Sequence, residues 1–495
     1  MTVRIAVIGG GIVGACISRV LSRYEDLEIH LIEREVDVGW GSTKANTSLI
    51  HAGYDDDPDK YPVRASFCAW GNRLWRRWVD ELEIRSNWPG DLVLAYTDED
   101  IEMLKTLLRR AERNHVPEVH ILWNREEIRR LEPNVNPEVR AALYAPSGGQ
   151  VWHPVSATIA VVENAVENGV RLHLETEVRG IEVRNGEISA VDTNRGRIEV
   201  DWVINAAGLY ADEISQMAGI DEFKIVPRRG EYYIFSRDAY PKVRRILFPA
   251  PKPWTKGVVV TTTVDGHLMI GPNAEDLSEE EKEMRETTVE GLEYVWNEAS
   301  KLVEKLPPRR GIIRSFAGVR IEPKPKPDFI VKAYDEVLGF INAAGMRSPG
   351  FTSAPAIAEY IAKLLRDRDV KLVRKKKWNP FRRDIRSFRE AGWNERERLI
   401  ENNSLYGRII CQCELVTEAE ILEAIRRGAT TLDGVKFRTR AMSGDCQGSF
   451  CLHRIAEILS RELNIPLWKV RKSGAGSEIG VGNVAILVGD KNEES

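Results

Sequence analysis

The chain has 495 residues, 43% of them hydrophobic and 29% charged, and a formal net charge of −4 at pH 7. This length accommodates about two to four domains with cores of their own, and the slightly acidic balance argues against nucleic-acid binding, which favours a basic domain. No apolar run approaches the roughly eighteen residues of a membrane-spanning helix, and the N-terminus carries no signal peptide, so a cytoplasmic protein is predicted.

The start of the chain has the pattern of a dinucleotide-binding unit. Residues 3–8 are apolar and β-branched, which predicts a buried parallel strand. A helix over 15–23 and a second strand over 29–32 follow, and Glu33 at its end is placed to bind ribose hydroxyls. A G-x-G-x-x-G motif precedes the helix, at Gly9, Gly11 and Gly14. Such glycines permit a tight turn and let the helix N-terminus approach a pyrophosphate.

A second Gly/Ser/Thr-rich loop, over residues 39–53, indicates FAD, because ordinary NAD domains do not need it. At this point the chain resembles the FAD-dependent oxidoreductases of the D-amino-acid oxidase type. Within them it is most similar to the branch of the glycerol-3-phosphate and L-2-hydroxyglutarate dehydrogenases. The resemblance covers roughly residues 1–370 and rests on the glycine motif and on blocks at 48–53, 229–233, 265–273, 317–320 and 342–350.

The resemblance implies an α/β fold (α+β overall), in which a Rossmann-like FAD-binding domain is interleaved with an antiparallel β-sheet substrate domain. We expect this oxidoreductase part to span 1–375, with FAD-binding segments at about 1–80, 150–220 and 310–370 and substrate-binding segments at about 81–149 and 221–309. The residues that the resemblance places at FAD are Gly9, Gly11, Ile12, Val13, Gly14, Glu33, Arg34, Gly41, Ser42, Thr43, Asn46, Ser48, Val178, Ala207, Gly208, Gly318, Gly345, Arg347, Ser348, Pro349, Gly350, Phe351 and Thr352.

Histidines are the first candidates for the chemistry, because oxidation of an alcohol by a flavin requires a base for the hydroxyl proton. His51 lies in the loop that the resemblance places beside the isoalloxazine ring, so we expect it to be the base or to orient the substrate. A structural hydrogen bond or a covalent bond to the flavin are the alternative roles. His267, after a turn at 265–266, is the second candidate.

An anionic substrate needs a fixed cation, and arginine offers two parallel donors to a phosphate or carboxylate. The resemblance implies that Arg320 contacts the substrate anion in the catalytic site. Arg229, Lys256 and Ser348 are predicted as further substrate contacts, and an ordinary surface ion pair is the alternative for each arginine.

The choice of substrate depends on residues 257–263, which lack the histidine and arginine that 2-hydroxyglutarate enzymes usually carry before their Asp-Gly turn. This difference favours sn-glycerol 3-phosphate as donor and dihydroxyacetone phosphate as product. Dehydrogenation of L-2-hydroxyglutarate, or of another hydroxy or amino acid, is the alternative among enzymes. An electron-transfer or redox-sensing module with a vestigial flavin pocket is the alternative outside catalysis.

Residues 376–407 are predicted as a linker, and a basic, Trp- and Arg-rich stretch runs from 374 to about 400. A solvated linker is one interpretation of this stretch. Contact with acidic lipid headgroups at the inner face of a membrane, or with a partner subunit, is the other.

Four cysteines follow in the pattern C-x-C and C-x4-C, at Cys411, Cys413, Cys446 and Cys451. Four thiolates are the ligands of an iron–sulfur cluster. The sequence Thr417-x-x-Glu420 predicts a capping box for a helix over 418–427, and a second helix is expected over about 450–463. Residues 408–480 resemble the small helical [2Fe-2S] domain of the bacterioferritin-associated ferredoxin type. Structural zinc is the alternative, although zinc ribbons prefer C-x2-C.

The two redox centres predict a partner. Removal of a hydride from the substrate yields two electrons, whereas a [2Fe-2S] cluster carries one at a time. We therefore expect a separate electron-acceptor subunit or flavoprotein, and an oligomeric assembly.

Overall fold

The structure is a computed structural model that describes residues 2–252 and 256–482. The chain divides into two compact units, which are described separately below. The first unit comprises Met1–Arg34 and Val38–Arg382, and the second comprises Glu35–Asp37 and Arg383–Ser495. Within the described part of the chain, none of the helices has both the length and the apolar character needed to span a bilayer.

A six-stranded sheet forms one half of the first unit, with the strand order β20-β21-β13-β1-β2-β9. Its strands are β1 (Val3–Ile8), β2 (Leu27–Ile32), β9 (Arg171–His173), β13 (Trp202–Asn205), β20 (Ile330–Ala333) and β21 (Phe340–Ala344). All neighbours are parallel except β20, which pairs antiparallel with β21 at the edge. The inner strands β1 and β2 end in four successive buried residues each, as expected for a parallel sheet that is covered on both faces.

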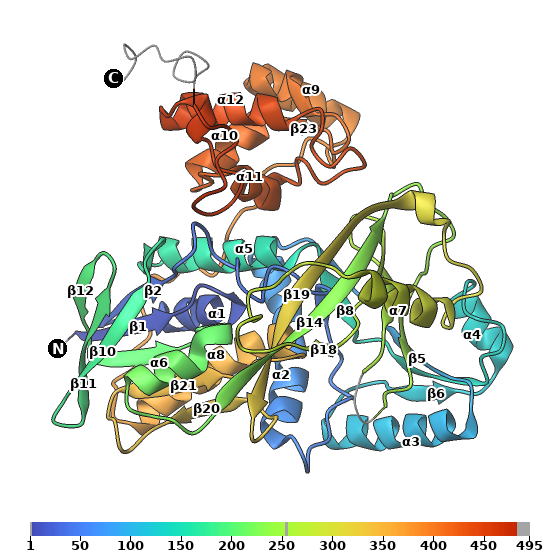
Figure 1. The fold of residues 1–495 in the computed structure, drawn as a ribbon, viewed down its shortest axis with the longest axis horizontal. Coiled ribbons are helices and arrows are strands. Elements are labelled where there is room, and N and C mark those ends of the chain that lie inside the picture. The colour runs from blue at the N-terminus through green and yellow to red at the C-terminus, as the bar shows by residue number, and fades with distance from the viewer. Residues whose placement is uncertain (1, 253–255, 483–495) are drawn as a thin grey trace. The chain divides into compact units, whose positions relative to one another are not determined.

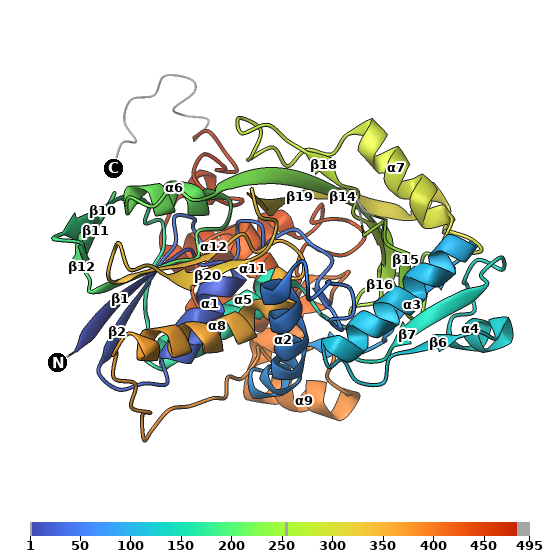
Figure 2. The ribbon, with the colours of Figure 1, turned by 90° about the horizontal axis from the view of Figure 1, so that it is seen from below.

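Three helices belong to this half of the first unit, namely α1 (Ile12–Leu21), α5 (Pro154–Glu167) and α8 (Gly350–Asp367). α1 packs against both α5 and α8 and lies between them in Figure 1. The long helix α2 (Pro62–Glu81) packs along α8, as Figure 2 shows. The short helix α6 (Ala211–Met217) contacts β13 and β21. A three-stranded antiparallel sheet lies beside it, formed by β10 (Val178–Arg184), β11 (Glu187–Thr193) and β12 (Gly196–Glu199).

A nine-stranded sheet forms the other half of the first unit. Its longest strands, β14 (Lys224–Phe235) and β19 (Ile312–Lys324), run antiparallel side by side (Figure 1). The remaining strands are β5 (Asp91–Ala95), β6 (His120–Leu122), β7 (Ala141–Ala145), β15 (Ile246–Pro249), β16 (Val259–Thr262), β17 (Leu268–Gly271) and β18 (Glu275–Asp276). The associated helices are α3 (Asp98–Arg113), α4 (Arg125–Leu131) and α7 (Val289–Ser300). Side chains of β5 alternate between two cores, Leu92 and Leu94 in one and Val93 and Ala95 in the other, because successive residues point to opposite faces.

A small sheet lies at the start of α2 and places the loop that carries His51. Its order is β3 (Leu49–Ile50), β8 (Gly149–Val151) and β4 (Ser86–Asn87). Leu49 pairs with Gln150, and Ile50 pairs with Gly149, so the chain leaves the sheet at His51.

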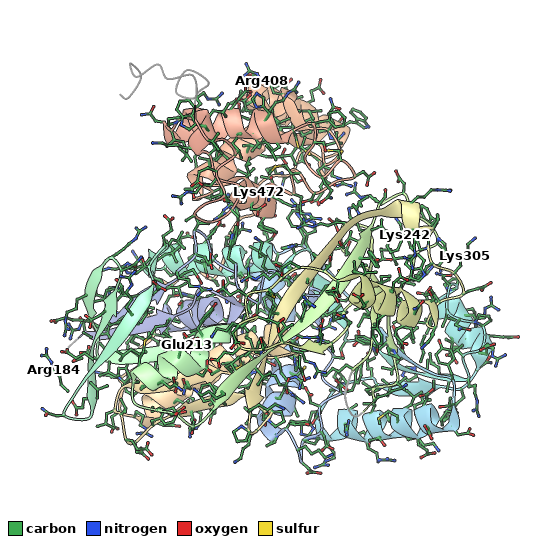
Figure 3. The ribbon with its side chains drawn as sticks, in the orientation of Figure 1. Arg184, Glu213, Lys242, Lys305, Arg408 and Lys472 are labelled. Carbon is green, nitrogen blue, oxygen red and sulfur yellow. The ribbon has the colours of Figure 1, made fainter. Side chains whose placement is uncertain are left out.

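The second unit is mostly helical. It contains α9 (Trp393–Asn402), α10 (Glu418–Arg426), α11 (Leu432–Thr439) and α12 (Leu452–Leu463), with a two-stranded ladder of β22 (Ile409–Cys411) and β23 (Val416–Thr417). Residues of α10, α11 and α12 form its core together with Cys411 and Cys451. Charged side chains such as Arg184 on the first unit and Arg408 on the second are exposed (Figure 3).

The predicted fold class is confirmed, as are the elements at the N-terminus and around the cysteines. The helix predicted over 15–23 begins earlier, at Ile12, and the helix predicted over 418–427 ends at Arg426. The capping box is present, because Thr417 accepts from the Glu420 backbone N–H and Glu420 accepts from the Thr417 backbone N–H. In the second unit, two helices were not anticipated. One is α9, inside the segment predicted as linker, and the other is α11.

Candidate active site and cluster site

The glycine motif forms a turn that only glycine can make. Gly9 has φ +106°, and a Cβ on it would lie 2.4 Å from the Ala206 carbonyl oxygen. A Cβ on Gly14 would lie 2.0 Å from the Gly9 carbonyl oxygen. α1 begins directly after the turn, and its N-cap residue, Gly11, offers no side chain to the first N–H groups. These N–H groups and the helix dipole suit the pyrophosphate of a dinucleotide.

The residues around this turn fit FAD. Glu33 at the end of β2 accepts a hydrogen bond from the Gly10 N–H at 2.7 Å. The Ser42 hydroxyl is buried and has no protein partner, as expected for a group that awaits a ligand. Thr43 accepts from the Ile12 N–H at 3.2 Å. Gly318 approaches the same loop so closely that a Cβ on it would lie 2.1 Å from the Ala45 carbonyl oxygen.

The other predicted FAD residues lie on the surrounding elements. Asn46 stabilises its own loop by donating to Thr43 O and accepting from Ser48 N. Val178 at the start of β10 and Ala207 after β13 pack against one hydrophobic cluster of the sheet. Arg34 forms an ion pair with Glu283. The contact of each of these residues with FAD stays a prediction.

The segment from Gly345 to Thr352 lines a second helix N-terminus. β21 ends at Ala344, Gly345 turns the chain at φ +72°, and α8 begins at Gly350. Its N-cap, Pro349, provides no side-chain cap. A positive helix end of this kind stabilises negative charge on a reduced flavin. Arg347 donates to Glu322 at 2.6 Å, which fixes the loop.

His51 is held through its backbone and its ring. Its N–H donates to Thr352 Oγ1 at 2.9 Å, and its carbonyl oxygen accepts from Asn72 Nδ2 at 3.0 Å. Its Nε2 lies 3.2 Å from Ser348 Oγ. The His51 side chain is half-buried. Its pKa is lowered to about 4, mainly by burial and also by the positive charge of Lys256. The imidazole is therefore neutral near pH 7 and can accept a proton.

Lys256 belongs to a partly buried group of charges beside His51. Its Nζ contacts Asp55 Oδ2 and lies 3.6 Å from Asp56 Oδ1. Asp56 in turn accepts from Arg64 Nε at 2.8 Å. The sequence interpretation identified Lys256 but neither aspartate, although the run Asp55-Asp56-Asp57 directly after the His51 loop was a visible signal.

The two candidate arginines are neighbours with different partners. Arg229 on β14 forms an ion pair with Glu275 at 2.7 Å and also donates to the Glu286 carbonyl oxygen. Arg320 on β19 donates to the carbonyl oxygens of Arg229 and Asn273. Its Nε is buried and has no partner within the protein. Burial lowers the pKa of Arg320 to about 10, so the guanidinium is still charged near pH 7.

One further side chain has a role that the sequence did not reveal, and one sequence candidate has a structural contact. Asn72, in the middle of α2, bridges the carbonyl oxygens of His51 and Ser147. No sequence signal marks it, because its partners are distant in the chain. His267, the second candidate base, lies in the turn before β17, where its Nδ1 is 2.8 Å from the Phe235 carbonyl oxygen. This geometry supports a structural role for His267.

The four cysteines of the second unit form two hydrogen-bonded pairs, Cys411 with Cys451 and Cys413 with Cys446. Cys411 ends β22, and Cys451 is the N-cap residue of α12. No group of three or more His, Cys, Asp and Glu side chains among residues 2–252 and 256–482 has the arrangement of a site for a metal ion. A [2Fe-2S] cluster is bound by four cysteine thiolates, and the two cysteine pairs supply this donor set.

Within each pair the hydrogen bond lowers the pKa of one thiol, Cys411 or Cys446, and raises that of its partner, Cys451 or Cys413, so one cysteine of each pair is favoured as the thiolate that binds iron. The hydrogen bond from the Cys451 thiol lowers the pKa of Cys411 to about 6. Burial alone would raise the pKa of Cys446, but the backbone N–H groups of Phe450 and Gly448 outweigh it and lower that pKa. A Cβ on Gly444 would lie 2.4 Å from the Cys413 Cβ, so the loop requires glycine there.

Comparison with known proteins covers both units. The model of the family FAD dependent oxidoreductase matches residues 4–364, and that of the BFD-like [2Fe-2S] binding domain matches residues 409–461. A glycerol 3-phosphate dehydrogenase of Caloramator mitchellensis is 41% identical, over 96% of this chain and 97% of that protein. The anaerobic glycerol-3-phosphate dehydrogenase subunit A1 of Haloferax volcanii is 26% identical, over 92% and 83%.

A solved structure has the fold of the first unit. The dithionite-reduced L-alpha-glycerophosphate oxidase from Mycoplasma pneumoniae, with FAD bound, matches with a TM-score of 0.71 and 30% identity. The match covers 77% of this chain and 98% of the oxidase.

Proposed function

Because the chain belongs to the FAD dependent oxidoreductase family and carries a BFD-like [2Fe-2S] binding domain, we propose that it oxidises sn-glycerol 3-phosphate to dihydroxyacetone phosphate. Electrons pass through FAD and the cluster to a separate acceptor. One observation carries the proposal. The likeness to a glycerol 3-phosphate dehydrogenase extends over 96% of the chain and so includes both cofactor domains.

The arrangement around His51 supports this chemistry. FAD, when bound, supplies the acceptor for the hydride that leaves the substrate carbon. The neutral His51 Nε2 takes the hydroxyl proton, and Ser348 beside it orients the hydroxyl. Arg320 carries a buried charge and an Nε without a protein partner, which suits an anionic substrate group. Lys256 supplies a second cation, and Arg229, already paired with Glu275, acts at the edge of the site.

The larger parts of the molecule have corresponding roles in this proposal. Segments 81–149 and 221–309, which build most of the nine-stranded sheet, bind the substrate, and the rest of residues 1–375 binds FAD. The acceptor is a partner subunit or flavoprotein that collects single electrons from the cluster, within an oligomeric assembly.

The basic stretch that begins at residue 374 is a weaker candidate for contact with a membrane. Several of its cations already have internal partners: Lys375 donates to the Asn168 carbonyl oxygen, Arg382 to Glu163, and Arg396 to the Phe388 carbonyl oxygen. A protein that associates with the inner face of a membrane would need the remaining cations for that contact.

Anaerobic titration of the oxidised holoprotein tests the proposed function. sn-Glycerol 3-phosphate should bleach the flavin absorbance and then reduce the cluster, whereas L-2-hydroxyglutarate and L-proline should leave both spectra unchanged. Bleaching by L-2-hydroxyglutarate but not by the phosphate ester would transfer the substrate assignment to the dicarboxylate. An intact cluster in a protein whose flavin no donor reduces would favour the electron-transfer module.

A further inference from the structure

Four charged side chains form a compact group beside the His51 loop, in which Asp56 and Arg64 are buried and Asp55 and Lys256 are half-buried. Lys256 Nζ contacts Asp55 Oδ2 and approaches Asp56 Oδ1 to 3.6 Å. Arg64 Nε donates to Asp56 Oδ1 at 2.8 Å, and both of these side chains are only 4% exposed. The group is neutral overall, with two cations and two carboxylates.

The two aspartates are held differently. Asp56 is the partner of Arg64, whose guanidinium also donates to the Pro327 carbonyl oxygen and whose backbone N–H donates to Asp328. This pair is therefore anchored on two sides. The Asp55 carboxylate instead has Lys256 as its ion-pair partner, while its carbonyl oxygen accepts from Arg110 at 3.0 Å. Asp55 is therefore fixed by its backbone, and its carboxylate depends on Lys256.

Asp55 and Lys256 act on His51 in opposite directions. Lys256 lowers the pKa of His51, and Asp55 raises it. Burial would raise the pKa of Asp55, but the charges of Lys256, His51 and Arg64 together lower it, with Lys256 contributing most. Asp55 is thus an ionised carboxylate that interacts electrostatically with the Lys256 ammonium and with the His51 imidazole.

We propose that Asp55 is a positioning residue with two functions: it is the counter-ion that lets His51 hold the substrate proton, and it competes with the substrate anion for Lys256. This inference rests on the proposed function and deepens it. During oxidation the hydroxyl proton moves to His51 Nε2 while the hydride leaves the carbon. The positive charge of Lys256 destabilises the resulting imidazolium, and the negative charge of Asp55 stabilises it. In the absence of substrate, the same carboxylate holds the ammonium that would otherwise attract a phosphate.

The two functions predict an unusual combination of effects. Loss of the Asp55 carboxylate weakens proton uptake, so kcat falls. The loss also releases Lys256, so anions bind more tightly. A residue with a merely structural role would instead weaken binding and turnover together.

The test compares D55N with D56N in the FAD-loaded full-length chain. kcat and KM are measured with sn-glycerol 3-phosphate, and the Kd of inorganic phosphate is measured from its perturbation of the flavin spectrum. For D55N we expect kcat to fall by on the order of tenfold or more, as part of a general-base contribution worth roughly 10²–10⁴-fold. We also expect its phosphate Kd to decrease severalfold. For D56N the phosphate Kd should decrease less than for D55N, since Asp56 lies 3.6 Å from Lys256 Nζ and has Arg64 as its hydrogen-bonded partner.

Equal effects of D55N and D56N, or a higher phosphate Kd in D55N, would overturn the proposal. D55E, which restores the carboxylate, should recover part of kcat. If D55N does not fold, the pH profiles of K256M and D55N/K256M replace it. K256M should move the acid limb of kcat to higher pH, and removal of Asp55 in the double variant should move it back; an unmoved limb contradicts the proposal.

The phosphate titration also separates this inference from the proposed function. Wild-type protein that is not bleached by sn-glycerol 3-phosphate refutes the proposed function. The change of phosphate Kd in D55N still decides whether Asp55 competes for Lys256, because that measurement needs no turnover.

Discussion

Asn72 offers the sharpest test of how the fold positions the candidate base. Its side chain is 4% exposed, and Nδ2 uses both of its hydrogens, one for the His51 carbonyl oxygen at 3.0 Å and one for the Ser147 carbonyl oxygen at 2.9 Å. In N72A both carbonyl oxygens lose the Asn72 donor, and the His51 oxygen keeps only the weak Cys68 thiol contact at 4.0 Å. With about 1 kcal/mol for each hydrogen bond, and up to about 1 kcal/mol more for each acceptor left buried, the first unit should lose roughly 2–4 kcal/mol of stability.

Asn114 provides a matched control. It is also buried, and its Nδ2 also bridges two carbonyl oxygens, those of Gly53 at 3.0 Å and Asp56 at 2.9 Å. N114A should therefore cost a similar free energy without touching His51 directly. Thermal release of flavin measures the stability of each variant, and steady-state turnover of sn-glycerol 3-phosphate measures the geometry of the base.

The two variants should differ in turnover. A base displaced by about 1 Å loses on the order of 100-fold in rate, so kcat should fall about 10- to 100-fold in N72A and only a few-fold in N114A. Similar melting points with clearly different kcat values are the expected result. If N72A turned over substrate at the wild-type rate, the hydrogen bond to the His51 carbonyl oxygen would have no positioning role, and the reasoning would fail.

Three further predictions concern the cofactors and the base. Because burial holds the pKa of His51 near 4, the base is already deprotonated at neutral pH; kcat should be flat from about pH 5 to 8 and fall only below that, which a pH profile with a stable acceptor will show. G9A should abolish FAD binding, because its Cβ would lie 2.4 Å from the Ala206 carbonyl oxygen at φ +106°; a yellow, FAD-loaded G9A protein would contradict this. C413S should lose iron and sulfide while the flavin is still bleached by substrate, as elemental analysis and anaerobic titration can check.

Local patterns explain which parts of the fold were predictable from the sequence. The strand, glycine turn and helix at the N-terminus, and the capping box of α10, depend on residues close together in the chain. α9 escaped prediction because it buries none of its residues and so has no apolar period. α11 escaped for the opposite reason, since it is buried almost throughout, from Leu432 to Arg438, and shows no polar face.

The candidate site was predictable only where a motif marks it. His51, Ser348 and the four cysteines lie in recognisable blocks, whereas Asn72 has no sequence signal and Asp55 is marked only by the run of three aspartates after the His51 loop. Asn72 reaches Ser147, which is 75 residues away, and Asp55 reaches Lys256 on a segment of the other sheet. No periodicity or spacing encodes such pairs, so only the folded chain reveals them.

The two arginines show why a residue type alone cannot assign a role. Arg229 and Arg320 lie on adjacent strands and look equivalent in the sequence. Arg229 forms an ion pair with Glu275, and a substrate anion would have to disrupt this pair. Arg320 is anchored by neutral carbonyl oxygens, which orient the guanidinium but leave its charge uncompensated. A buried, oriented cation of this kind gains more from a bound phosphate than a cation that must first give up a carboxylate. We therefore expect Arg320 to bind a substrate anion more strongly than Arg229, because of the different partners that the fold gives them.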